Sequence, residues 1–121
     1  MVQYAEDRSS ETQFELGQMF HKAKTNEQDY EQAVKWYTQA AKQGHRRAQH
    51  RLGAMYAKGL GVSVDYTKAY AWCEVAASQQ SKRALLMLKK IEKKMSRQQI
   101  EQARKLAKRY YRLYVASSVY Y

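Results

Sequence analysis

The sequence predicts an all-α protein that is built from an internal repeat of helix pairs. The chain has 121 residues, a length typical of one domain. It contains no proline and only five glycines, so few positions oppose helix formation. Alanine, glutamine, lysine, arginine and leucine, which all favour helices, are abundant. A repeat within the chain supplies the third observation.

Two segments of the chain align without a gap at an offset of 36 residues. The matching positions include Leu16-Gly17 with Leu52-Gly53, Asp29-Tyr30 with Asp65-Tyr66, Trp36 with Trp72, and Ala40-Ala41 with Ala76-Ala77. Tryptophan, glycine and paired alanines keep one register, which chance similarity would not produce. We therefore expect a single domain, 1–121, that contains repeats at 12–47 and 48–83, a half repeat at 84–95 and a basic capping helix at 96–116.

Each repeat is expected to contain two helices. Ala48, Leu52 and Tyr56 are spaced as one face of the first helix. Gly53 lies inside that helix at a cost of about 1 kcal/mol, so we expect a neighbouring helix to approach closely there. Glycines in the loop 59–62 permit positive φ where the first helix ends. Asp65 then serves as the predicted N-cap of the second helix.

The third unit is predicted to be incomplete. Ala84, Leu88 and Ile91 continue a first helix, and Ser96 with Gln99 has the form of a capping box. The last helix has one apolar stripe, formed by Ile100, Ala103, Leu106, Ala107, Tyr110, Leu113 and Tyr114. Because this helix departs from the repeat, we expect it to cap the open end of the stack.

These residues resemble the Sel1-like repeat family, which is related to the tetratricopeptide repeats. The second unit carries most of the likeness, through Ala48, Leu52-Gly53, Tyr56, Gly59, Gly61-Val62, Asp65, Lys68-Ala69, Trp72 and Ala76-Ala77. The resemblance covers residues 12–95. It implies an α-α superhelix, a short solenoid of about two and a half helix pairs with a C-terminal capping helix. It also implies a role as a non-catalytic adaptor or scaffold.

The sequence departs from the family pattern in two turns. Residues 23–26 stand where the family has glycines, and we expect a different turn in which Asn26 tolerates the left-handed conformation. Gln80 replaces the glycine that corresponds to Gly44, so the turn after residue 79 is also expected to differ.

The resemblance further implies that the first helices line a concave groove. The groove positions would be Phe14, Gln18, His21, Arg47, His50, Lys58, Arg83, Leu86, Lys90, Lys93 and Lys94. This surface grows more basic toward the C-terminus. It fits an acidic protein segment or a terminal carboxylate, with apolar contact from Phe14 and Leu86. The alternative, that these lysines are solvated surface charges with no partner, is equally consistent with the sequence.

The positive charge is concentrated near the C-terminus. Residues 82–112 hold twelve Lys and Arg against Glu92 and Glu101, which accounts for +10 of the net +11. An anionic partner and a merely solubilising surface both explain this asymmetry. The alternative function is nucleic-acid or polyanion binding by the last helix, through Arg97, Arg104, Lys105, Lys108, Arg109 and Arg112. Membrane attachment ranks last, because the stack already needs the apolar face of that helix.

Other classes of function receive little support. Cys73 is the only cysteine and is expected to pack in the second helix; no disulfide, metal site, cofactor or catalytic group is predicted. Trp36, Trp72 and the repeated tyrosines are interpreted as core. With no signal peptide and no spanning segment in the sequence, we expect a cytoplasmic protein. A homodimer through the tail, with Tyr120 and Tyr121, is a further expectation.

Overall fold

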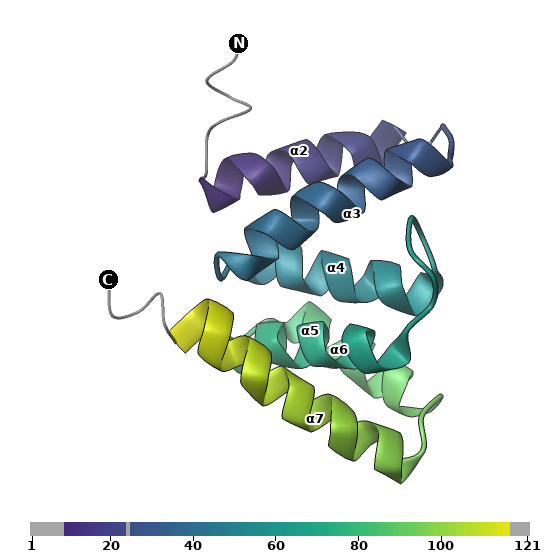
Figure 1. Ribbon diagram of the computed structural model, residues 1–121, viewed down its shortest axis with the longest axis vertical. Helices are drawn as coiled ribbons and strands as arrows, with labels where there is room; N and C mark the ends of the chain where they lie inside the picture. Colours follow the sequence, from purple (N-terminus) through teal and green to yellow (C-terminus); the bar gives the residue numbers. More distant parts are fainter. Residues whose placement is uncertain (1–8, 24, 117–121) are drawn as a thin grey trace.

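The computed structural model describes residues 9–23 and 25–116, and the regular structure within them is helical. The elements are α2 (Ser10–Ala23), α3 (Glu27–Lys42), α4 (Arg46–Lys58), α5 (Tyr66–Ser78), α6 (Lys82–Glu92), α7 (Arg97–Tyr111) and a π-helical turn (Arg112–Ala116). Figure 1 shows these helices stacked in layers, from α2 and α3 at one end to α7 at the other. The predicted all-α class is confirmed.

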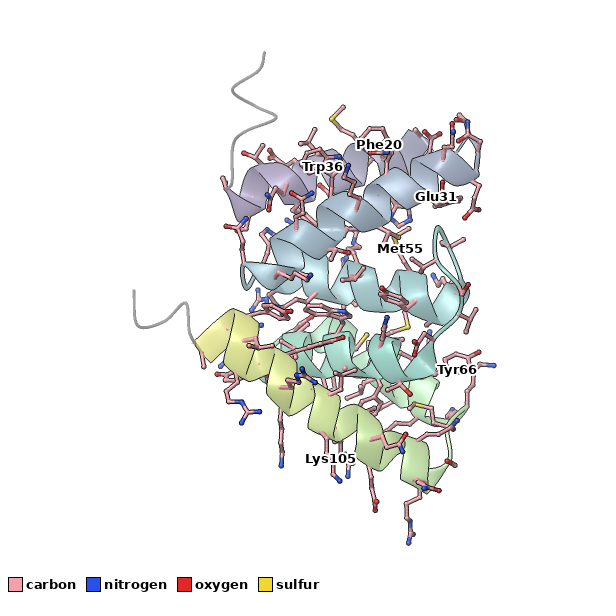
Figure 2. The ribbon with its side chains drawn as sticks, in the orientation of Figure 1. Phe20, Glu31, Trp36, Met55, Tyr66 and Lys105 are labelled. Carbon is pink, nitrogen blue, oxygen red and sulfur yellow. The ribbon has the colours of Figure 1, made fainter. Side chains whose placement is uncertain are left out.

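The helices pair and stack as the repeat requires. Helix α2 packs on α3 and α4 on α5, while α3 contacts α4 and α5 contacts α6 across successive units. Helix α7 instead lies against α5, and the π-helical turn reaches back to α3. The core follows this order: Figure 2 shows Met55 between α3 and α4, and Leu88, Ile91 and Ala103 join the cluster around α5.

The two helices of each repeat approach each other closely at a glycine. A Cβ atom added to Gly17 would lie 2.5 Å from the Cδ1 atom of Tyr37. One added to Gly53 would lie 2.5 Å from the Sγ atom of Cys73 and 3.0 Å from the Ala69 carbonyl oxygen. The close approach predicted at Gly53 is therefore confirmed, as is the packing role of Cys73, which is fully buried.

The predicted helix ends are also confirmed. Gly59 ends α4 with a φ of 71°, and the Asp65 carboxylate accepts the Lys68 backbone N–H at 3.0 Å. Ser96 and Gln99 form the reciprocal capping box: the Ser96 hydroxyl accepts the Gln99 N–H at 3.1 Å, and the Gln99 amide oxygen accepts the Ser96 N–H at 2.8 Å.

The turn at Gln80 is a correction, because it does not differ from its counterpart at Gly44. Gln80 adopts a φ of 72° and Gly44 a φ of 87°. The N–H of Gly44 donates to the Ala41 carbonyl at 3.0 Å, and that of Gln80 donates to the Ala77 carbonyl at 2.9 Å. In both turns, carbonyls of the preceding helix thus hold the same left-handed conformation. At Gln80 this conformation strains the backbone, whereas a glycine would adopt it without strain.

Asn26 is a second correction, because it does not adopt the left-handed conformation. Its φ is −161°, and its side chain accepts the Asp29 N–H at 3.1 Å, which makes it the N-cap of α3. The turn after α2 does differ from the loop after α4, as expected. It is shorter, since α3 begins at Glu27 while α5 begins at Tyr66.

Leu113 is a third correction, since it leaves the predicted apolar stripe of the last helix. Its side chain is 52% exposed, whereas Val115 is buried in its place. The cause is the π-helical turn over Arg112–Ala116, which adds residues to the turn and rotates the side chains that follow.

In each repeat, a buried glutamine accepts a hydrogen bond from a second glutamine, a contact that the sequence did not reveal. The Gln43 side chain donates to Gln13 Oε1 at 2.6 Å, and Gln79 donates to Gln49 Oε1 at 2.7 Å. These two pairs are related by the same offset of 36 residues. Gln49 also donates to the Ala41 carbonyl at 3.1 Å, which ties α4 to α3. Because buried amides require their partners, this contact favours one register between repeats.

We predict that Gly53→Ala destabilises the protein by about 1–3 kcal/mol, because the new methyl group overlaps Cys73. Urea unfolding measures the change. The double variant Gly53→Ala with Cys73→Ala should recover part of the loss, because it removes the Sγ atom. If the two single effects simply add, the proposed contact is not what makes Gly53 necessary.

We predict that Gln80→Gly stabilises the protein by about 0.5–1 kcal/mol, since glycine adopts positive φ without a Cβ penalty. Gly44→Ala, the matched change in the first repeat, should destabilise it. Thermal unfolding of the two variants checks the pair, and a lower melting temperature for Gln80→Gly would contradict the assigned turn.

Candidate functional site: a basic depression between two helix starts

A depression of about 330 Å³ lies between the N-terminal turns of α4 and α6. Its lining is predominantly cationic and consists of Arg46, Arg47, His50, Arg51, Gln80, Ser81, Lys82 and Arg83. The structure thus brings together three predicted groove residues, Arg47, His50 and Arg83. Sequence reasoning missed Arg46, Arg51 and Lys82. The 36-residue offset, which places the starts of α4 and α6 at equivalent positions, could have indicated Arg46 and Lys82; Arg51 aligns with Met87 and carries no such signal.

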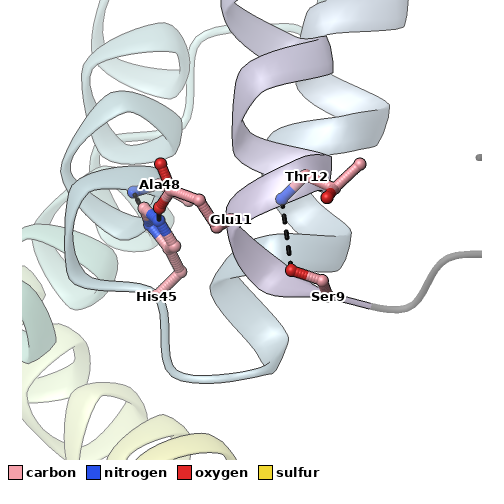
Figure 3. A network of polar contacts seen from close by, with 5 residues as sticks. All are labelled: Ser9, Glu11, Thr12, His45 and Ala48. Atoms are coloured by element: carbon pink, nitrogen blue, oxygen red, sulfur yellow. Dashed lines mark hydrogen bonds and ion pairs between the residues drawn. The ribbon is translucent and has the colours of Figure 1, made fainter.

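Side-chain caps position both helix starts. The His45 ring accepts the Ala48 N–H at 3.1 Å, and its Nε2 atom lies 2.8 Å from Glu11 Oε1 on α2, as Figure 3 shows. The Ser81 hydroxyl accepts the Ala84 N–H at 3.1 Å. Because these caps define where α4 and α6 begin, the residues of both first turns converge on the depression.

Contacts within the protein constrain three of the arginines. The guanidinium carbon of Arg47 lies 4.6 Å from the centre of the Phe14 ring, and that of Arg51 lies 6.0 Å from it. Arg46 donates from Nη1 to the Gln79 carbonyl at 2.8 Å. The cation–π contacts keep Arg47 and Arg51 beside the same aromatic ring, so two positive charges are held close together.

These cations lack acidic partners in the part of the chain that the structure describes. Its one ion pair joins His45 and Glu11, and no carboxylate there lies within 4.0 Å of an Arg or Lys of the depression. Neither α4 nor α6 has an acidic residue in its first turn. Cations at a helix N-terminus oppose the macrodipole, and like charges four residues apart repel. The cluster therefore costs stability, and a bound anion would relieve that cost.

The positive potential of this cluster affects the protonation of His50. Burial lowers the pKa of the half-buried imidazole below its ordinary value, and the charges of Arg51, Arg83 and Lys58 lower it further. The ring is consequently neutral near pH 7. A neutral imidazole can accept or donate a hydrogen bond beside the arginines without adding to their mutual repulsion.

The remaining predicted groove residues do not line the depression. Leu86 is 63% exposed, and Lys58, Lys90, Lys93 and Lys94 are exposed as well. Gln18 is half-buried, and His21 lies 3.2 Å from the Tyr37 hydroxyl in the first repeat. Phe14 is a correction: it is fully buried and stacks on His45, so it supports the arginines and offers no apolar surface to a partner.

The alternative basic surface lies on α7 and, at Arg112, on the π-helical turn that follows it. Its six predicted cations are all exposed, and Figure 2 shows Lys105 projecting away from the stack. Arg104 donates from Nε to the buried Tyr70 hydroxyl at 3.2 Å. Tyr110 and Tyr114 stack on Trp72 with ring centres 4.4 and 5.7 Å away. This confirms the packing role predicted for these two tyrosines and leaves neither ring free for a nucleic-acid base.

The described residues offer neither a metal site nor a membrane span. They hold no cluster of three or more histidine, cysteine or acidic side chains able to bind a metal ion. None of their helices is long and apolar enough to cross a membrane. The dimer contact expected of Tyr120 and Tyr121 falls outside the residues that the structure describes.

Antiparallel helix pairs that repeat every 36 residues and stack into layers define an α-solenoid. The model of the Sel1 repeat matches residues 10–45 and 46–81, and the chain belongs to this family. Both matches begin slightly before the bounds of 12 and 48 expected from the sequence. Proteins of this family are generally protein–protein interaction modules, and the fold is typically a non-catalytic scaffold.

A solved structure supports the same assignment. The chain is similar to c5321, a protective antigen present in uropathogenic Escherichia coli strains whose crystal structure displays an SLR fold. The sequences are 33% identical, and the TM-score is 0.86 over 94% of this chain. The match spans only 25% of that protein. A search of curated proteins found no match.

We predict that stability falls as the pH is lowered through 6.5 and below, because folding lowers the pKa of His50 and the unfolded chain then binds more protons. His50→Gln should lose less stability than the parent protein between about pH 7.5 and about pH 5.5. Urea unfolding at the two pH values measures the difference. Identical pH dependence in the two proteins would show that His50 does not contribute.

Proposed function

We propose that this chain is a non-catalytic interaction module that binds an acidic protein segment on its basic concave face. The observation that carries the proposal is the depression between α4 and α6. Five permanently charged side chains meet there with no carboxylate of the described residues in ion-pair distance. An acidic segment would supply the missing charge, and burial of its side chains would exclude water from the contact.

The surface beside the depression suits an extended segment. Arg83, Leu86 and Lys90 follow one another at helical spacing along α6, so they form a row of neighbouring side chains. Leu86 is exposed and offers apolar contact between two cations. A segment with an apolar residue between acidic ones would match this row, while one anionic side chain enters the depression.

The exposed cations of α7 support the second candidate, polyanion binding. Two features count against it. Tyr110 and Tyr114 are engaged with Trp72, and Arg104 is held by Tyr70, so fewer groups are free to bind a nucleic acid than the sequence suggested. If this candidate is right, the affinity for the polyanion should fall steeply as salt is added.

We predict that Arg47→Glu with Arg83→Glu weakens binding of an acidic peptide at least about tenfold, because two attractive contacts become repulsive. The peptide is selected from a library of acidic segments, and fluorescence anisotropy measures its affinity. Lys105→Glu with Arg109→Glu is the matched control on α7, and it should change the affinity less than about twofold.

Two outcomes would contradict the proposed function. Equal losses in the two double variants would show that net charge alone attracts the peptide. Tight binding of a single-stranded RNA that is lost only in the α7 variant, together with weak binding of every acidic peptide, would establish polyanion binding instead.

A further inference from the structure

We infer that the depression between α4 and α6 is a phosphate pocket, which holds a phosphorylated side chain of the bound protein segment. This inference rests on the proposed function and names the group that the depression takes. It is carried by the number, kind and arrangement of the cations in the lining, which exceed the needs of a single carboxylate.

Charge balance is the first argument. Arg46, Arg47, Arg51, Lys82 and Arg83 surround one depression, and the described residues place no carboxylate within ion-pair distance of any of them. An aspartate or glutamate would contribute one negative charge. A phosphorylated serine or threonine contributes about −1.5 to −2 at neutral pH and three acceptor oxygens. The phosphate therefore relieves more of the repulsion in the lining.

The kind of cation is the second argument. Four of the five cations are arginines, and the guanidinium fork donates two parallel hydrogen bonds to a phosphate. The remainder of α6, by contrast, carries only lysines, Lys89 and Lys90. A lysine is sufficient for a solvated positive charge, whereas several guanidinium groups together suit an anion that has several acceptor oxygens. The depression is thus richer in arginine than the rest of α6, although Lys82 also lines it.

Arrangement is the third argument. Arg47 and Arg51 rest beside the Phe14 ring, so part of the entropy of ordering them is lost before a ligand arrives. Arg83 approaches from α6, on the other side of the depression. Phosphate oxygens placed between these helices can accept from both. The N–H groups of the first turn of α6 add positive potential at the same place.

The test uses the full chain and two small probes that differ only in their anion. Isotope-labelled protein is titrated with N-acetyl phosphoserine amide and, separately, with N-acetyl aspartate amide, and NMR follows the shifts. We expect saturable shifts at Arg47, His50, Lys82 and Arg83, with phosphoserine bound at least about tenfold more tightly. The pKa of His50 should rise on binding, because the phosphate offsets the charges of Arg51, Lys58 and Arg83.

Variants locate the pocket. Arg47→Gln and Arg83→Gln should each weaken phosphoserine binding at least about fivefold, and Arg83→Lys should lie between Arg83→Gln and the parent protein. Both arginines are exposed, so folding should persist, which circular dichroism checks. Arg109→Gln, an exposed arginine on α7, is the matched control and should leave the affinity unchanged.

Three results would overturn the inference. They are equal affinities for phosphoserine and aspartate, shifts confined to α7, and no saturable shift at all. If acidic peptides bind the concave face while phosphoserine shows no advantage, only the phosphate pocket fails. If phosphoserine binds in the depression but no acidic segment does, the interaction module fails instead.

Discussion

The close approach of the paired helices at Gly17 and Gly53 is the constraint on which the remaining structure depends. With no side chain at these positions, α2 rests on the ring of Tyr37, and α4 rests on the sulfur of Cys73. This short separation makes each helix pair a compact unit that can stack every 36 residues. The stacking in turn places the starts of α4 and α6 side by side, so the basic depression is a consequence of how the helices pair.

Sequence reasoning succeeded where a single residue type meets a local structural requirement, such as a close helix contact or a helix cap. A glycine inside a helix marked the contact at Gly53, and Asp65 and Ser96 marked helix starts. It failed at Gln80 because a propensity describes the residue alone, whereas the carbonyls of Ala76 and Ala77 hold the turn. The glutamine contacts within each repeat were missed for a related reason, since a glutamine in sequence indicates a polar surface and its buried partner is distant in the chain.

The site was only partly predictable, for reasons of geometry. The resemblance placed Arg47, His50 and Arg83 on first helices, and the structure brings them to one depression. Arg51 was overlooked, although the contact with Phe14 positions it beside Arg47. Phe14 was misplaced because an aromatic residue on a groove-facing helix suggests partner contact. Its ring instead fills the space between Tyr37 and His45.

The first turns of the helices show how this fold separates stability from binding. Helices α2 and α3 begin with acids, Glu11 in one and Glu27 and Asp29 in the other, as the macrodipole favours. Helices α4 and α6 begin with Arg46, Arg47, Lys82 and Arg83, which the macrodipole opposes. These four cations are exposed, while Ala48 and Ala84 of the same turns face the apolar core, so the core tolerates either choice. Because the unfavourable choice occurs where two helix starts converge, and no carboxylate of the described residues pairs with these cations, an anion bound in the depression would offset its cost.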